Sequence, residues 1–266
     1  MLVTAEPPSV RRYRSVFTSQ FGSVRTSHAA VEHPQIVRGH EAQPWHYGMH
    51  PSNAHRQIMD YDALAALAPP QKPKLLSVIS SNKLVTEDHR QRLRFVEQLK
   101  SAFGDQIDVF GRGIRDMSDK SDAIWDYKYH IVLENDHSEF YMSEKLPDSY
   151  LGWSFPFYSG SVYASSVFRE GSFGRIDMYD PTSSIATIQN HIRSNAFELN
   201  HKLVTQSRAM VLDELNLFAV LCNAYDSMIE RVGSPSKNSN RTTLLPKKKS
   251  VRLSVRRFMR ALSLAA

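Results

Sequence analysis

The chain alternates short apolar runs with segments of helical spacing, most clearly between residues 74 and 160. Apolar and β-branched runs predict strands at 75–79, 106–110, 126–133 and 155–160. Leu93, Val96 and Leu99 share one face of a helix after the first run, and residues 144–151 are a second predicted helix. Because strands and helices alternate, the sequence predicts parallel βαβ units in an α/β fold.

The flanking segments are patterned differently. Residues 2–5 form an apolar run that stops at two prolines, and residues 23–27 are a further candidate strand. Residues 33–52 read as irregular, whereas residues 185–229 have mostly helical spacing. In that helical segment we interpret the apolar face as packing, and its members are Val211, Leu212, Leu215, Phe218, Ala219 and Cys222.

The cysteine count and the hydropathy indicate in which cellular compartment the protein resides. Cys222 is the one cysteine, so no intrachain disulfide can form, and we interpret it as a small core residue. No run reaches the roughly eighteen apolar residues that a membrane span requires, and the first residues lack the pattern of a signal peptide. The sequence therefore favours a cytoplasmic protein.

The positive charge is concentrated at the C-terminus. Residues 233–266 contain nine Lys and Arg and no Asp or Glu, so the net charge of +6 becomes −3 for the rest of the chain. The stretch from Lys247 to Leu264 has the apolar and basic stripes of an amphipathic membrane-surface helix. We expect it to contact an anionic membrane on the inner leaflet; a helix packed on the body and a disordered tail are the alternatives. Nucleic acid is not an expected partner, because the body is mildly acidic.

Polar residues and glycines follow the predicted strands. They are Asn82, Gly111, Glu134 with Asn135, and Gly160. In parallel sheets ligands bind beyond the carboxyl ends of the strands, so these residues converge in space. Tyr141, Glu144 and Lys145 follow shortly after Asn135, at the start of the second predicted helix. An aromatic ring, an acid and a base at that place suit a phosphorylated sugar.

The chemistry of sugar transfer from a nucleotide suggests a role for each residue type. A carboxylate must take the proton of the acceptor hydroxyl, and the departing diphosphate must be neutralised by a metal or by cations. Lys145 and Arg92 are the candidates for the diphosphate, with Arg90 and Arg94 as rivals of Arg92. Asn135 could bond the diphosphate or sugar hydroxyls, and Tyr141 could stack on the base or bond a phosphate. Glu144 could accept ribose or sugar hydroxyls or stabilise positive charge.

The order of these motifs resembles that of family 10 glycosyltransferases, the α-1,3/4-fucosyltransferases. The similarity is carried by Glu6 to Ser9, Ser81-Asn82, Arg92 to Leu99, Ile107 to Gly111, Tyr127 to Asn135, Tyr141 to Lys145, Pro156 to Gly160 and Ser172-Phe173. The resemblance implies a GT-B type enzyme with a Rossmann-like sheet, inverting and metal-independent, that uses GDP-fucose as donor, a glycan as acceptor and no cofactor. It implies Glu6 as general base and a donor site of Arg92, Asn135, Tyr141, Glu144 and Lys145, with Asn82 and Gly111 beside them.

The resemblance also implies an organisation in three parts. Residues 1–73 would be the remnant of an incomplete acceptor-binding lobe, 74–232 the nucleotide-sugar-binding domain with its C-terminal helices, and 233–266 the basic tail. Two departures stand out. The first lobe is short, and Pro147 lies in the first turn of the helix that carries Lys145.

Other functions are weighed against this one. A non-catalytic homologue that binds a GDP-sugar or a partner would keep the same pocket, and a nucleic-acid binder would use the basic tail. Asp60-Tyr61-Asp62 has the spacing of a metal–diphosphate motif, but it lies in a segment of helical spacing and not at a strand end. His46, His50 and His55 lie in an irregular segment with no cysteine beside them, so no metal is expected.

Overall fold

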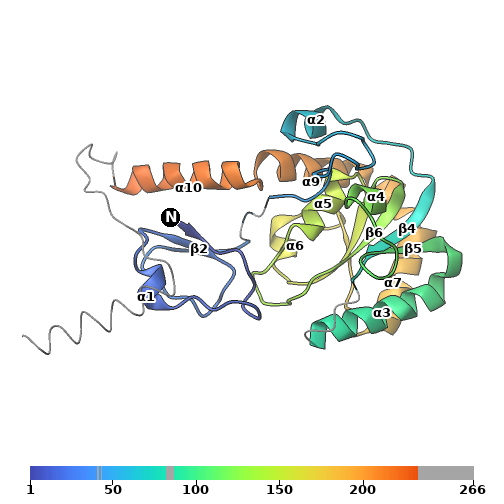
Figure 1. Cartoon of the computed structure of the whole chain (residues 1–266), viewed down its shortest axis with the longest axis horizontal. Helices are drawn as coiled ribbons and strands as arrows, with labels where there is room; N and C mark the ends of the chain where they lie inside the picture. Colours follow the sequence, from blue (N-terminus) through green and yellow to red (C-terminus); the bar gives the residue numbers. More distant parts are fainter. Residues whose placement is uncertain (41, 43, 82–86, 233–266) are drawn as a thin grey trace, which may run out of the picture.

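The computed structural model describes residues 1–40, 42, 44–81 and 87–232, with side chains described as far as Ser227 (Figure 1). Asn82 and the basic tail therefore lie outside the described residues. Two parallel sheets lie side by side, a small one near the N-terminus and a larger one that carries most of the helices.

The larger sheet confirms the predicted βαβ pattern. Its strands are β4 (Lys74–Ile79), β5 (Ile107–Phe110), β6 (Tyr127–Leu133), β7 (Phe155–Ser159) and β8 (Gly174–Arg175). They are parallel and follow the order β5-β4-β6-β7-β8. This is a doubly wound order, in which the chain leaves β4 toward one edge and β6 toward the other. The point of divergence between β4 and β6 is where ligands bind in such sheets.

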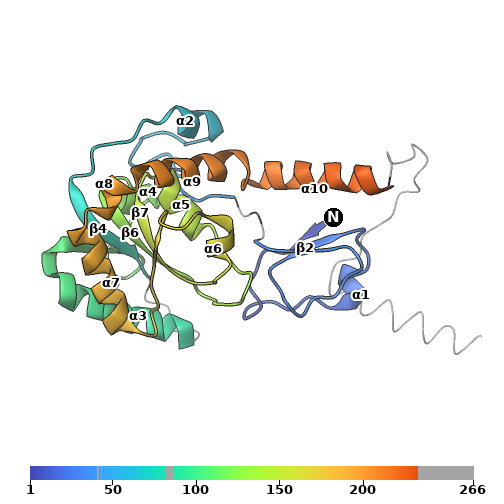
Figure 2. The ribbon, with the colours of Figure 1, turned by 180° about the vertical axis from the view of Figure 1, so that it is seen from behind.

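Helices cover both faces of this sheet (Figures 1 and 2). They are α3 (Glu87–Phe103), the 3₁₀ turn η1 (Gly104–Gln106), α4 (Ser121–Ile124), α5 (Lys145–Leu151), α6 (Ala164–Val167), α7 (Pro181–Arg193), α8 (Ala196–Leu199), α9 (His201–Asp213) and α10 (Leu217–Val232). Helix α3 packs against α7 on one face, and α5 packs against α9 on the other. Strand β6 is consequently buried almost throughout, because both of its faces are covered.

The small sheet consists of β1 (Leu2–Val3), β2 (Val24–Thr26) and β3 (Ile36–Arg38), with α1 (Ser15–Thr18) between the first two strands. Its strands are parallel and follow the order β1-β2-β3. The first two strands agree with the sequence prediction. Strand β3 was not predicted, since it is three residues long in a proline- and histidine-rich segment.

The segment between the two sheets packs with the larger one. It includes α2 (Tyr61–Ala66), whose first turn is capped by the Asp60 carboxylate through the Ala63 N–H. Tyr47, Met59 and Leu64 belong to the hydrophobic core of the larger sheet. Asp60 thus has a structural role as a helix cap. The predicted domain boundary at residue 73 stays a prediction.

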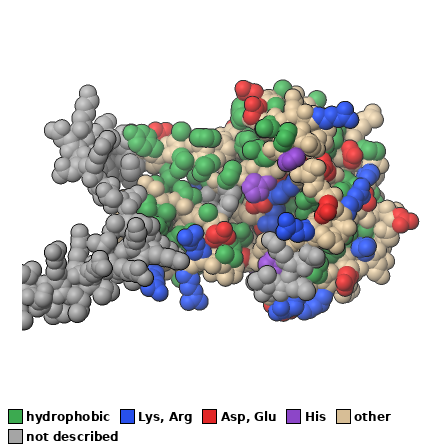
Figure 3. All heavy atoms as spheres, viewed as in Figure 1, with side chains coloured by type: hydrophobic (Ala, Val, Ile, Leu, Met, Phe, Trp, Pro, Cys, Tyr) green, Lys and Arg blue, Asp and Glu red, His purple; other side chains and the backbone are tan. Residues whose placement is uncertain are grey.

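The interpretation of Cys222 as a core residue is wrong. Helix α10 runs beyond the larger sheet and alongside the small one (Figures 1 and 2), and most of its described side chains are exposed. Cys222 is exposed and Phe218 is 78% exposed, and apolar side chains remain visible along this helix (Figure 3). Val211 and Leu212 are buried as expected, because they precede the point where the chain leaves the core. No helix among the described residues is long and apolar enough to cross a membrane.

Candidate active site

Arg92 joins the two strand ends at the point where the sheet diverges. It projects from α3, and its guanidinium donates one hydrogen bond to Asn135 Oδ1, just beyond β6. A second hydrogen bond, of 3.3 Å, goes to Ser81 Oγ, just beyond β4. The rival arginines, Arg90 and Arg94, instead form exposed ion pairs with Glu87 on the same helix. Arg92 is therefore the one that points inward.

A cavity of about 200 Å³ opens at this place. Arg92, Lys120 and Lys145 bring cationic side chains to its lining, and Ser81, Asn135 and His130 also contribute to it. Burial, with the charges of Lys120 and Lys72 nearby, lowers the pKa of His130 to about 3, so this ring is neutral. The positive charge of the cavity thus comes from Arg92, Lys120 and Lys145.

The Arg92 guanidinium is prepared for a ligand. It is 5% exposed, and burial lowers its pKa, partly offset by the charge of Glu134. Its Nε–H group is buried and has no hydrogen-bond partner among the described residues. Leaving such a donor unpaired costs about 1–3 kcal/mol. An anionic ligand in the cavity could supply the missing acceptor.

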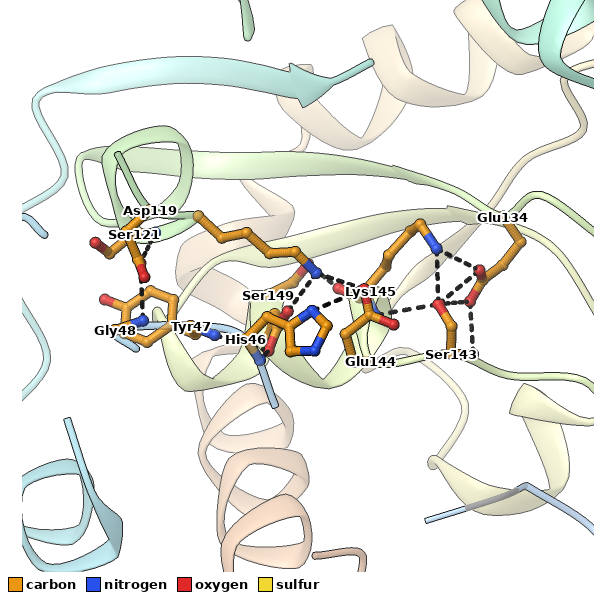
Figure 4. A network of polar contacts seen from close by, with 12 residues as sticks. His46, Tyr47, Gly48, Asp119, Ser121, Glu134, Ser143, Glu144, Lys145 and Ser149 are labelled. Atoms are coloured by element: carbon orange, nitrogen blue, oxygen red, sulfur yellow. Dashed lines mark hydrogen bonds and ion pairs between the residues drawn. The ribbon is translucent and has the colours of Figure 1, made fainter. Parts of the chain in front are cut away.

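Glu134 fixes the position of Lys145 (Figure 4). The Glu134 carboxylate is fully buried and accepts hydrogen bonds from the Ser143 N–H at 2.9 Å and from Ser143 Oγ. Lys145 Nζ lies 3.2 Å from Glu134 Oε2 and 3.0 Å from Ser143 Oγ. The sequence placed Glu134 at a strand end without giving it a role, and the structure shows that it orients the lysine.

Lys120 was missed by the sequence analysis. Its Nζ donates to Glu144 Oε1 at 2.7 Å and to Asp148 Oδ2 at 2.6 Å, where Asp148 is fully buried. Burial by itself lowers the pKa of Lys120, but the charges of Asp148 and Glu144 raise it above its ordinary value. Burial by itself raises the pKa of Glu144, but Lys145 and Lys120 lower it below its ordinary value. Lysine and glutamate are therefore both charged at neutral pH.

The same network reaches the segment between the sheets (Figure 4). Asp148 Oδ1 accepts hydrogen bonds from the N–H groups of His46 and Tyr47, at 2.9 and 3.2 Å. The His46 ring lies 3.6 Å from Glu144 Oε1. Glu144 is thus held from two sides, and it lines a small pocket with Trp45 and Pro147 rather than the cationic cavity.

Pro147 does not disturb the site. Helix α5 begins at Lys145, so Pro147 is in its first turn, where backbone N–H groups have no partner within the helix. The proline therefore removes no helical hydrogen bond.

Gly111 and Tyr141 have other surroundings. Gly111 has φ +130°, and a Cβ there would lie 2.1 Å from the Ser80 carbonyl oxygen, so the glycine lets β5 end against β4. Tyr141 is buried and does not line the cavity described above. Their donor-binding roles stay predictions, as does that of Asn82.

Glu6 lies on the loop that follows β1. It is exposed, and its carbonyl oxygen accepts a hydrogen bond of 2.7 Å from His28 Nε2. Three residues on, the Ser9 N–H donates to Asp136 Oδ2 at 3.1 Å. Since Asp136 directly follows Asn135, the loop of Glu6 is held at the edge of the cationic cavity. Its role as a base stays a prediction.

Residues 69–224 match the model of the family described as glycosyltransferase family 10 (fucosyltransferase), C-terminal part. The chain belongs to glycosyltransferase family 10. The match covers β4 to β8 and every residue that lines the cationic cavity. No protein among the curated ones matches this chain.

Solved structures agree with the fold of a family 10 glycosyltransferase. An α1,3-fucosyltransferase solved with GDP-fucose is 16% identical, with a TM-score of 0.51 over 85% of this chain and 72% of that one. A glycosyltransferase from Rickettsia africae ESF-5 is 12% identical, with a TM-score of 0.52 over 89% of this chain and 69% of that one. The predicted GT-B type architecture, with parallel sheets flanked by helices, is confirmed.

Proposed function

We propose that this glycosyltransferase moves fucose from GDP-fucose to a hydroxyl group of a glycan, with inversion and without a metal ion. The family supports the reaction class, and a protein of the same fold was solved with GDP-fucose. The observation that carries the proposal is the convergence of Arg92, Lys120 and Lys145 on one cavity where the sheet diverges.

These cations suit a nucleoside diphosphate as leaving group. When the glycosidic bond breaks, negative charge grows on the diphosphate, and fixed cations in a partly dry cavity stabilise it. Arg92 offers its unpaired Nε–H, and Lys145 is already oriented by Glu134. Their charges take the part that a divalent cation has in metal-dependent enzymes. Among the described residues no group of three His, Cys, Asp or Glu is placed to hold a metal ion.

The sugar end of the donor would lie toward the small sheet. There Asn135 could bond sugar hydroxyls through its amide, and the ionised Glu144 could accept a hydroxyl or stabilise the positive charge of the transition state. Glu6 would take the proton of the acceptor hydroxyl from the side opposite the diphosphate, which gives inversion. Asn82, Gly111 and Tyr141 complete the proposed donor site.

A non-catalytic role is the second candidate. The cationic cavity is built by the larger sheet alone, whereas the candidate base is exposed on a small sheet with strands of two or three residues. A chain of this kind would bind GDP-fucose without turnover. To separate the two candidates, the protein is incubated with GDP-fucose and a mixture of glycans, and the release of GDP is measured.

The donor site is tested by titration calorimetry with GDP. We expect Arg92→Ala and Lys145→Ala to abolish measurable binding. Arg90→Ala is the matched control, because Arg90 lies on the same helix but pairs with the exposed Glu87. If both cavity variants bind GDP as the parent does, the proposed roles are wrong.

We also propose that the segment from Lys247 to Leu264 attaches the cytoplasmic enzyme to anionic lipids. Its sequence combines basic and apolar stripes, which favours binding at the surface of the inner leaflet.

A further inference from the structure

A second cavity, of about 490 Å³, lies at the carboxyl ends of β7 and β8. Its main polar and aromatic lining residues are His137, Ser159, Arg175, Asp177, Tyr179 and Asp180. It borders the cationic cavity, because the Glu134 N–H donates to the Ser159 carbonyl oxygen at 2.9 Å and His137 lies two residues beyond Asn135. None of the roles proposed above uses it.

The charges of this cavity suit a neutral ligand with hydroxyl groups. Asp177 and Asp180 each use one carboxylate oxygen to accept a backbone N–H, from Tyr179 and Ser183. Their second oxygens accept no hydrogen bond from the part of the chain that the structure describes. The Arg175 guanidinium donates to the carbonyl oxygens of residues 160 and 161. Two carboxylates would repel a phosphate but can accept hydrogen bonds from hydroxyls.

An aromatic ring is available for the apolar face of a sugar. Tyr179 is 50% exposed, and its ring meets the His137 ring edge-on, with centroids 5.7 Å apart. The Tyr179 hydroxyl donates to Asp88 on α3, which fixes the ring at the rim. A fixed aromatic ring beside acceptor oxygens suits a pyranose, which has C–H groups on its faces and hydroxyls at its edge.

The loop after β6 connects the second cavity with the proposed reaction. Asn135 lines the cationic cavity, Asp136 holds the loop of Glu6 through Ser9, and His137 lines the second cavity. A ligand in the second cavity would therefore lie close to both the donor and the candidate base. We propose that this cavity binds a saccharide ring of the glycan acceptor, an inference that rests on the proposed function.

The test is an NMR titration with lactose, a neutral disaccharide, in the presence of saturating GDP. We expect the parent to bind, and Tyr179→Ala to weaken lactose binding by roughly fivefold or more, as loss of an aromatic contact predicts. Tyr61→Ala is the matched control. Tyr61 is 46% exposed and its hydroxyl also bonds an aspartate, Asp213, but it lies far from this cavity on α2. Asp177→Asn should also weaken lactose binding. Asp177 is exposed, and this substitution leaves the Tyr179 ring in place.

Each outcome decides the inference. Equal lactose affinity in Tyr179→Ala and the parent overturns it, as does a parent that binds GDP but not lactose. If Tyr179→Ala instead weakens GDP-fucose and leaves GDP unchanged, the cavity holds the sugar of the donor and the acceptor assignment is wrong. Failure of the parent to bind GDP overturns the proposed function itself, so the two failures are distinguishable.

Discussion

Replacing Lys120 by methionine removes the cation that two carboxylates share. Asp148 is fully buried, and the side chains of Glu144 and Lys120 are 14% and 17% exposed. Deleting one partner of a buried ion pair leaves an uncompensated charge, which costs about 3–5 kcal/mol. We therefore expect Lys120→Met to lower the free energy of unfolding by that amount at pH 7 and to weaken GDP binding, since the cavity loses a positive charge.

The effect of Lys120→Met on the free energy of unfolding should depend on pH. Lys120 and Lys145 hold the pKa of Glu144 below its ordinary value, so the stability from this group is present above the ordinary pKa and is lost as pH falls through the lowered one. In Lys120→Met the buried carboxylates can be protonated near their ordinary pKa or above it. The difference in stability between the parent and the variant should therefore shrink as the pH falls below 5.

Urea unfolding at pH 7 and at lower pH measures this difference. Lys128→Met is the matched control, because Lys128 Nζ lies 2.5 Å from Glu198 in an exposed pair, which should contribute less than about 1 kcal/mol. Lys120→Met combined with Asp148→Asn should recover part of the loss. A loss below about 1 kcal/mol in Lys120→Met, similar to that of the control, would refute the reasoning.

Further predictions follow from the base, the glycine and the tail. Glu6→Gln should lower turnover by roughly 10²–10⁴-fold while GDP affinity stays constant, as measured by GDP release and calorimetry; unchanged turnover would exclude Glu6 as the base. Gly111→Ala should destabilise the protein by about 1–3 kcal/mol in urea unfolding, since its φ is +130° and its Cβ would meet Ser80, and a neutral effect would contradict this geometry. Deletion of residues 233–266 should abolish co-sedimentation with vesicles of anionic lipid, and retained binding would show that the body binds them.

The sequence predicted the larger sheet because its strands are buried on both faces and therefore apolar over several residues. It predicted Arg92 as the diphosphate ligand from among three arginines on one helix, because Arg92 matches the family motif. The structure adds that the other two, Arg90 and Arg94, pair with Glu87. Strand β3 was missed, because it lies in a segment rich in proline and histidine.

Lys120 and Cys222 show where sequence patterns fail. Lys120 lies in the polar stretch 118–122, where a lysine is usually solvated, and its partner Asp148 is far away in the sequence. Helical spacing in α10 indicates an apolar face, but it does not show whether another layer covers that face. Phe218 and Cys222 are exposed because the helix continues past the core.

The central claim is that fixed cations hold the nucleoside diphosphate in place of a metal ion. Calorimetric titration of the parent with GDP, in EDTA and then in excess Mg²⁺, tests it most directly. We expect GDP to bind in EDTA with an affinity that Mg²⁺ does not raise. Binding that appears after Mg²⁺ is added, and is absent in EDTA, would contradict the claim.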